Sequence, residues 1–209
     1  MKIPTIEQIE ILFFGPGYGE SILIHIGYGD WIIVDSCINP QTKKPAVLEY
    51  LEQIGLSFDC IKLIIATHWH DDHIRGLYEI VKTCPNADFF LSQAVRQSEF
   101  IKLMSYYGFE TTINSKSGIQ ELYNIISFLQ SVKKKPKFAC QDRILWEKKN
   151  TNKNYSCEIR SLSPSDAAIL LSHSEIAKLI PKLNAPKRRL PSITPNHASV
   201  VLWYALIII

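Results

Sequence analysis

His68-Trp69-His70-Asp71-Asp72-His73 follows directly on the apolar run 61–67, which is typical of a buried strand. Neutral imidazole and carboxylate are the groups that a divalent cation such as Zn²⁺ prefers, so this stretch indicates metal binding. Two alternatives are a solvated histidine-rich loop and a helix N-terminus capped by Asp71 or Asp72. His68 and His70 are two residues apart, so in an extended segment their side chains leave the backbone on the same side. We predict that four side chains converge on one pocket as metal ligands: His68, His70, Asp72 and His73.

The surrounding elements are predicted from the period of their apolar residues and from turn signals. Strands are expected near residues 8–15, 20–27 and 30–35, and a helix over 45–54 ends at Gly55. Further along, the pattern predicts a strand over 61–66, a helix over 74–83, a short strand over 89–91, helices over 96–107 and 117–132, and a hairpin of 138–147 with 155–162. Strand–helix–strand alternation followed by meanders predicts an α/β protein with four layers, an αββα sandwich.

The pattern H-x-H-x-D-H at the end of an apolar strand resembles the signature of the metallo-β-lactamase superfamily of hydrolases. Residues 11–25 and 31–36 resemble the opening hairpins of that fold, which end in a buried aspartate, here Asp35. Residues 162–165 and 196–202 resemble the branch that contains the hydrolase domain of the DNA-internalisation competence protein. That branch continues with a Gly-Asp and a His-His-Gly, which this sequence lacks. The resemblance therefore implies one domain over residues 1–209, incomplete at its C-terminus and without the last metal-ligand strands.

The resemblance also implies the roles of individual residues. His68 and His70 match the first zinc site of the family, and Asp72 and His73 match the second, with manganese or iron as alternative metals. Each site would then keep two protein ligands, so low metal occupancy is expected. Asp72 and Asp35 are the expected catalytic residues, with Asp35 fixing the metal loop through hydrogen bonds, although a strand-end capping role is the alternative. Three further histidines are expected to be structural: His25, His173 and His197.

These residues predict a metal-dependent hydrolase that attacks a phosphodiester or related ester through a metal-bound hydroxide. The expected partner is a small-molecule or nucleic-acid phosphoester substrate. Because ligands are missing, we expect weak or absent turnover. The alternative is an inactive or partner-completed fragment that acts as a binding module.

Composition sets further bounds. The chain has 209 residues, of which 46% are hydrophobic, enough for one sizeable core. A net charge of +3 does not by itself indicate nucleic-acid binding, and the basic runs 133–137 and 187–189 are expected to be solvated. Five widely spaced cysteines without a C-x-x-C pair favour reduced thiols in the cytoplasm.

The apolar run 200–209 is too short to span a membrane and is expected to be a strand. We predict that the following side chains are buried inside the sandwich: Val200, Val201, Leu202, Trp203, Leu206, Ile207 and Ile208. The outer edge of this strand should lack a neighbour, which predicts self-association or pairing with a completing chain.

Overall fold

The computed structural model describes residues 3–15, 19–96, 98–107, 118–150, 155–180 and 195–208. The elements in chain order are β1 (Glu10–Phe14), β2 (Ser21–His25), β3 (Trp31–Val34), α1 (Ala46–Gln53), η1 (Phe58–Cys60), β4 (Ile61–Ala66), α2 (Asp71–Ile74), α3 (Leu77–Thr83), β5 (Asp88–Ser92), η2 (Gln93–Val95), α4 (Ser98–Tyr107), α5 (Gly118–Ser131), β6 (Lys137–Ala139), β7 (Arg143–Asn150), β8 (Tyr155–Ser161), α6 (Asp166–Leu179), η4 (Pro195–Ala198) and β9 (Leu202–Ile208).

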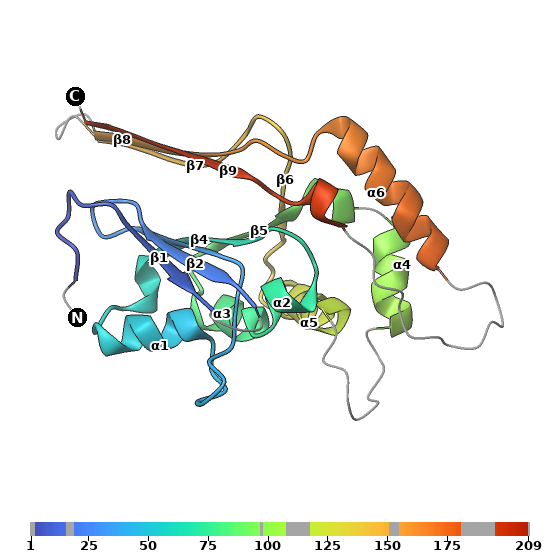
Figure 1. Cartoon of the computed structure of the whole chain (residues 1–209), viewed down its shortest axis with the longest axis horizontal. Helices are drawn as coiled ribbons and strands as arrows, with labels where there is room; N and C mark the ends of the chain where they lie inside the picture. The colour runs from blue at the N-terminus through green and yellow to red at the C-terminus, as the bar shows by residue number, and fades with distance from the viewer. Residues whose placement is uncertain are drawn as a thin grey trace.

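Two sheets stack face to face, which confirms the predicted α/β sandwich (Figure 1). The first sheet is mixed, in the order β1-β2-β3-β4-β5-β6, and its strands from β3 to β6 are parallel. Helices α1, α3 and α5 lie on its outer face, and the antiparallel sheet β7-β8-β9 lies on the other. Strands β3 and β4 are almost wholly apolar because a parallel sheet is covered on both faces. Helix α6 packs against α4 at one end of the sandwich.

Strands of the second sheet alternate between a buried and a solvated face. In β8, Tyr155, Cys157 and Ile159 are buried, whereas the residues between them are partly exposed. The same alternation occurs in residues 200–206, so the prediction that this apolar run is wholly buried is wrong in part. Val200 is buried and Leu202 and Leu206 pack partly against the inter-sheet core, but Val201 and Trp203 are 52% and 45% exposed. The side chains of Ile207 and Ile208 lie outside the described residues.

Two other predicted elements are divided in the structure. The helix expected over 74–83 is two helices, because Gly76 adopts a left-handed conformation with φ of 87° between α2 and α3. The strand expected over 138–147 is also two, since β6 pairs with β5 in the first sheet and β7 pairs with β8 in the second. Asp142, with φ of 59°, lies in the turn between them.

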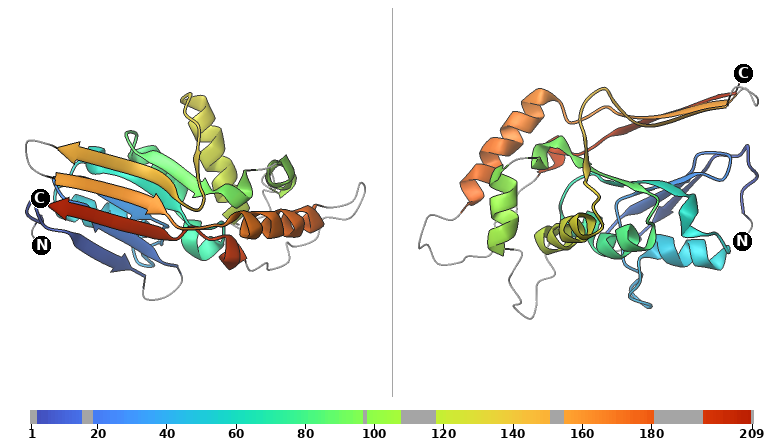
Figure 2. Two further views of the ribbon diagram at one scale, coloured as in Figure 1. Left: turned by 90° about the horizontal axis from the view of Figure 1, so that it is seen from above. Right: turned by 180° about the vertical axis from the view of Figure 1, so that it is seen from behind.

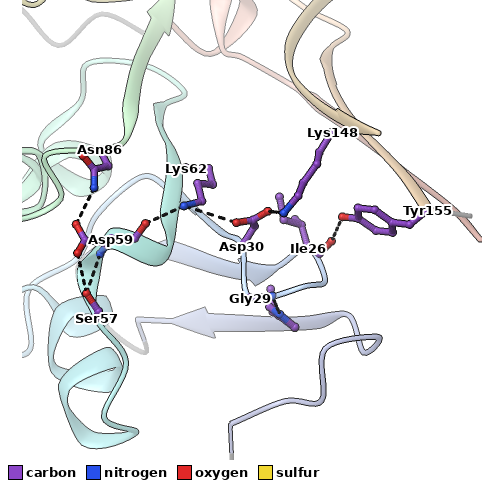
Figure 3. A network of polar contacts seen from close by, with 10 residues as sticks. Ile26, Gly29, Asp30, Ser57, Asp59, Lys62, Asn86, Lys148 and Tyr155 are labelled. Carbon is purple, nitrogen blue, oxygen red and sulfur yellow. Dashed lines mark hydrogen bonds and ion pairs between the residues drawn. The ribbon is translucent and has the colours of Figure 1, made fainter. Parts of the chain in front are cut away.

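A polar network joins the two sheets beside the N-terminal end of β3 (Figure 3). The buried carboxylate of Asp30 forms ion pairs with Lys148 of β7 and with Lys62 of β4, the latter at 3.6 Å. Nearby, the Tyr155 hydroxyl donates a hydrogen bond of 2.9 Å to the Ile26 carbonyl oxygen. The sheets are therefore held together at the end opposite to Asp35, which follows β3.

Strands β1 and β9 form edges of the two sheets along the same side of the sandwich (Figure 2). Within the described ranges, β9 pairs with β8 alone. All five cysteines are free. No helix in the part of the chain that the structure describes is long and apolar enough to span a membrane.

Candidate metal centre

The centre is built where the parallel strands β3 and β4 end. Carboxyl ends of parallel neighbours meet at one edge of a sheet, so Asp35, after β3, lies beside residues 67–73, which follow β4 and are called here the metal loop. The Asp35 amide donates to the Ile65 carbonyl oxygen at 2.8 Å, and the Ser36 amide donates to that of His73 at 2.7 Å. Asp35 has φ of 58°, a conformation that aspartate adopts more readily than most residues.

Asp35 is buried, and its carboxylate contacts two residues of the metal loop. Oδ1 accepts a hydrogen bond from the Thr67 amide at 2.7 Å. Oδ2 lies 2.6 Å from Thr67 Oγ1 and 2.8 Å from His73 Nδ1. Burial raises the pKa of Asp35, and the hydrogen bonds from His73 and Thr67 act in the opposite direction. This network supports the predicted role of Asp35 in fixing the loop.

The structure brings the four predicted ligands together. The ring centroid of His68 lies 4.0 Å from that of His73 and 5.0 Å from that of His70, and His73 Nε2 lies 3.8 Å from Asp72 Oδ2. Two groups have ligand atoms within 4.8 Å of one another: His68 with His70 and Asp72, and His68 with His73 and Asp35.

Protonation differs between the histidines of the centre. Burial, together with the neighbouring His73 and His70, lowers the pKa of His68 to about 4. Burial also lowers the pKa of His73, but the hydrogen bond and charge of Asp35 outweigh it, so the pKa of His73 is raised. At neutral pH His68 is therefore a neutral imidazole, the form that binds a metal ion.

The backbone of the metal loop is held from three other parts of the chain. The Gly118 amide at the start of α5 donates to Asp71 Oδ1, and a Cβ on Gly118 would lie 2.2 Å from the Trp69 carbonyl oxygen. The Glu20 amide donates to the Asp72 carbonyl oxygen at 3.0 Å. The Val200 amide donates to the Thr67 carbonyl oxygen, also at 3.0 Å.

The remaining sequence candidates have other positions. His25 lies at the far end of β2, where its Nε2 accepts a hydrogen bond from the Gly29 amide at 3.2 Å. His173 lies on α6, and His197 Nε2 lies 3.5 Å from a carboxylate oxygen of Glu175. None of these three histidines belongs to a ligand group among the described residues.

Sequence reasoning missed two residues that hold the metal loop, Thr67 and Gly118. It also offered Asp71 as a helix N-terminal cap, and the structure gives this side chain another partner. The side chain of Asp71 forms no N-terminal cap on α2 and instead bonds to Gly118. Thr67 could have been found from the sequence, because it directly precedes the first histidine of the motif. Gly118 could not, since it is distant in sequence and its importance depends on its close approach to the loop.

Comparison with known families identifies one match. Residues 14–90 match the model of the Metallo-beta-lactamase superfamily, and this segment contains Asp35 and the whole metal loop. The resemblance to that superfamily is therefore confirmed for this part of the chain. No curated protein matches the sequence.

Solved structures that are similar to part of this chain were also found. A HARLDQ motif mutant of a metallo-beta-lactamase from Cronobacter sakazakii is 14% identical, with a TM-score of 0.41, covering 72% of this chain and 50% of that chain. The hydrolase AbOPH in the beta lactamase superfamily is 20% identical, with a TM-score of 0.40, covering 69% and 52%. MEM-A1, a subclass B3 metallo-beta-lactamase from a soil metagenome library, is 17% identical, with a TM-score of 0.39, covering 71% and 48%. This chain thus spans about half the length of these structures.

Proposed function

We propose that this chain is a metal-dependent hydrolase of the metallo-β-lactamase superfamily that acts on a phosphodiester or related ester. The observation that carries the proposal is the convergence of His68, His70 and Asp72 within 4.8 Å. Two imidazoles and one carboxylate are a donor set that suits zinc, and catalytic zinc commonly takes three protein ligands and keeps one position open. The residues therefore fit the metal, with manganese and iron as alternatives.

We further propose that one ion binds per chain at a time. The two ligand groups share His68, and its Nδ1 is 2.9 Å from Thr67 Oγ1, which leaves Nε2 for a metal. In the second group, both oxygens of Asp35 already have hydrogen-bond partners. The group of His68, His70 and Asp72 is thus the better site.

A bound divalent cation supplies hydrolytic chemistry by lowering the pKa of a water ligand from about 15.7 to roughly 7 and by polarising the substrate oxygen. The protein's own residues orient the ligands. Asp35 holds His73 through Nδ1 and directs its Nε2 towards Asp72 Oδ2, 3.8 Å away. In this proposal Asp72 is a ligand, and Asp35 acts through the residues that it positions.

Placement in the competence-protein-like branch belongs to this proposal and rests on sequence resemblance. The two stretches that carry this resemblance, 162–165 and 196–202, meet where the Val201 amide donates to Ser163 Oγ at 2.9 Å. The proposed substrate is accordingly a small-molecule or nucleic-acid phosphoester. Free cysteines support a reducing, cytoplasmic location.

The alternative function is a metal-binding module without turnover, inactive alone or completed by a partner chain. It is favoured by the shared His68, because a single ion lacks the second cation of a two-metal mechanism.

Metal content and turnover separate these functions. Protein purified without chelator and dialysed against zinc should hold about one ion per chain by mass spectrometry of the metal, and His70→Ala and Asp72→Ala should each reduce this strongly. His197→Ala is the matched control, since this histidine lies outside the ligand groups among the described residues. Zinc-dependent cleavage of bis(p-nitrophenyl) phosphate that both variants lose supports the hydrolase, whereas zinc binding without cleavage supports the module. Equal zinc content in all four proteins would exclude both.

A further inference from the structure

We propose that Thr67 is a positioning residue that sets which nitrogen of His68 carries the proton. The proposal rests on the proposed metal-binding function and assigns a part of that site to a residue outside the ligand set. Its basis is a chain of contacts in which Thr67 Oγ1 lies 2.6 Å from Asp35 Oδ2 and 2.9 Å from His68 Nδ1.

The number of protons available fixes the direction of these hydrogen bonds. A threonine hydroxyl has one proton to donate, and an ionised carboxylate can only accept. Asp35 accepts a hydrogen bond from the Thr67 amide at Oδ1 and faces His73 Nδ1 at Oδ2. Burial raises the pKa of this carboxyl, whereas these two donors stabilise its charged form, and we take Asp35 as ionised. The Thr67 hydroxyl therefore donates its hydrogen bond to Asp35, so its oxygen accepts a hydrogen bond from the Nδ1–H group of His68.

This direction determines which nitrogen of His68 can bind a metal. With the proton on Nδ1, His68 presents the lone pair of Nε2, while the Nδ1 of His73 faces the same carboxylate of Asp35 directly. One buried carboxylate thus orients His73 directly and His68 through Thr67. The Thr67 amide donates a hydrogen bond of 2.7 Å to the same carboxylate, which holds the Thr67 side chain beside Asp35.

Two substitutions at position 67 separate the hydroxyl from the shape of the side chain. Thr67→Val keeps the branched shape but removes the hydroxyl, whereas Thr67→Ser keeps the hydroxyl. Loss of a group that orients a metal ligand typically costs about 10- to 100-fold in metal affinity. We expect that loss of zinc affinity in Thr67→Val and near wild-type affinity in Thr67→Ser. Ser92→Ala is a control, because its buried hydroxyl donates to the Ala198 carbonyl oxygen and forms no hydrogen bond to a metal-loop histidine among the described residues.

The direct test is the tautomer of His68 in metal-free protein, read from nitrogen-15 imidazole spectra at neutral pH. We expect a proton on Nδ1 in the wild type, Thr67→Ser and Ser92→Ala, and loss of this single tautomer in Thr67→Val. A proton on Nε2 of His68 in the wild type would overturn the proposal, and so would a Thr67→Val spectrum identical to it. If Thr67→Val does not fold, the wild-type and Thr67→Ser spectra still decide.

Zinc titration against a chromophoric chelator gives the second readout and distinguishes the two proposals. Wild-type protein with the expected tautomer but without zinc binding would defeat the proposed function and leave the role of Thr67 in the tautomer intact. Zinc binding with the opposite tautomer would do the reverse.

Discussion

The substitution Asp35→Asn should leave the protein folded and weaken zinc binding. Asparagine keeps the shape of the side chain and one acceptor oxygen, which can still accept the hydrogen bond from the Thr67 amide. Its NH₂ group would then face Thr67 Oγ1 and His73 Nδ1, where the carboxylate oxygen now accepts hydrogen bonds. To avoid two opposed donors, the imidazole of His73 and the hydroxyl of Thr67 must reverse. The hydroxyl then donates to His68 Nδ1 and leaves the His68 proton on Nε2, the nitrogen that would bind the metal.

The size of the effect follows from the bonds that change. A hydrogen bond to a charged group contributes about 1.5 to 3 kcal/mol, and Asp35 Oδ2 takes part in two such contacts, at 2.6 and 2.8 Å. Reorientation inside the loop recovers part of this free energy, so we expect the free energy of unfolding to fall by about 2 kcal/mol. Zinc affinity should fall by about 10- to 100-fold, the usual cost of losing a partner that orients metal ligands.

Chelator competition measures the zinc affinity, and urea unfolding of the metal-free protein measures stability. Asp30→Asn is the matched control, because it alters another buried carboxylate, one that pairs with Lys62 and Lys148 at the opposite end of β3. It should destabilise the protein without changing zinc affinity. Unchanged zinc affinity in Asp35→Asn, or an equal loss in Asp30→Asn, would refute the reasoning.

Four further predictions concern pH, packing and association. Burial lowers the pKa of His68 to about 4 in the folded protein, from 6.5 for the free side chain. Between these two pH values the unfolded chain binds more protons than the folded chain. The free energy of unfolding should therefore fall as pH decreases from 6.5 to about 4. Urea titrations should show that His68→Gln flattens this dependence, and an unchanged slope would contradict it. Gly118→Ala should lower both melting temperature and zinc affinity, since its Cβ would lie 2.2 Å from a carbonyl oxygen of the metal loop; a neutral result would show that α5 does not support the loop. Lys148→Met should lower the melting temperature by about 2 to 4 °C, as expected for about 1 kcal/mol, whereas Lys149→Met, which alters a more exposed ion pair, should not; equal effects would argue against an inter-sheet ion pair that stabilises the fold. Self-association through the edge of β9 stays a prediction: sedimentation should detect concentration-dependent oligomers that Ala205→Lys reduces, and monomers at all concentrations would exclude it.

The convergence of the candidate metal ligands could be predicted from sequence because these residues are local. His68 to His73 follow an apolar run, and the end of a buried strand limits where their side chains can lie. Asp35 was accessible only through family resemblance, because its meeting with the loop depends on β3 and β4 being parallel neighbours.

Non-local features could not be predicted in this way. An exposed Trp203 follows from which face of β9 meets the first sheet, and an apolar run with no polar alternation does not specify that face. The break at Gly76 is similar, because a glycine inside a helical pattern is compatible with either a helix or a turn. The separation of β6 from β7 depends on pairing with β5, which no short-range signal reports.

The centre precedes the second sheet along the chain, and this order bears on how the protein forms during synthesis. Only α1, η1 and β4 separate Asp35 from the metal loop, so their contacts close short stretches of chain and can form early. The Val200 amide, which bonds the Thr67 carbonyl oxygen, reaches the loop much later. Metal captured by the nascent chain would favour the folded arrangement of β3 and β4 before the second sheet exists. We therefore expect zinc supply during translation to influence the yield of folded protein, and zinc added after synthesis to influence it less.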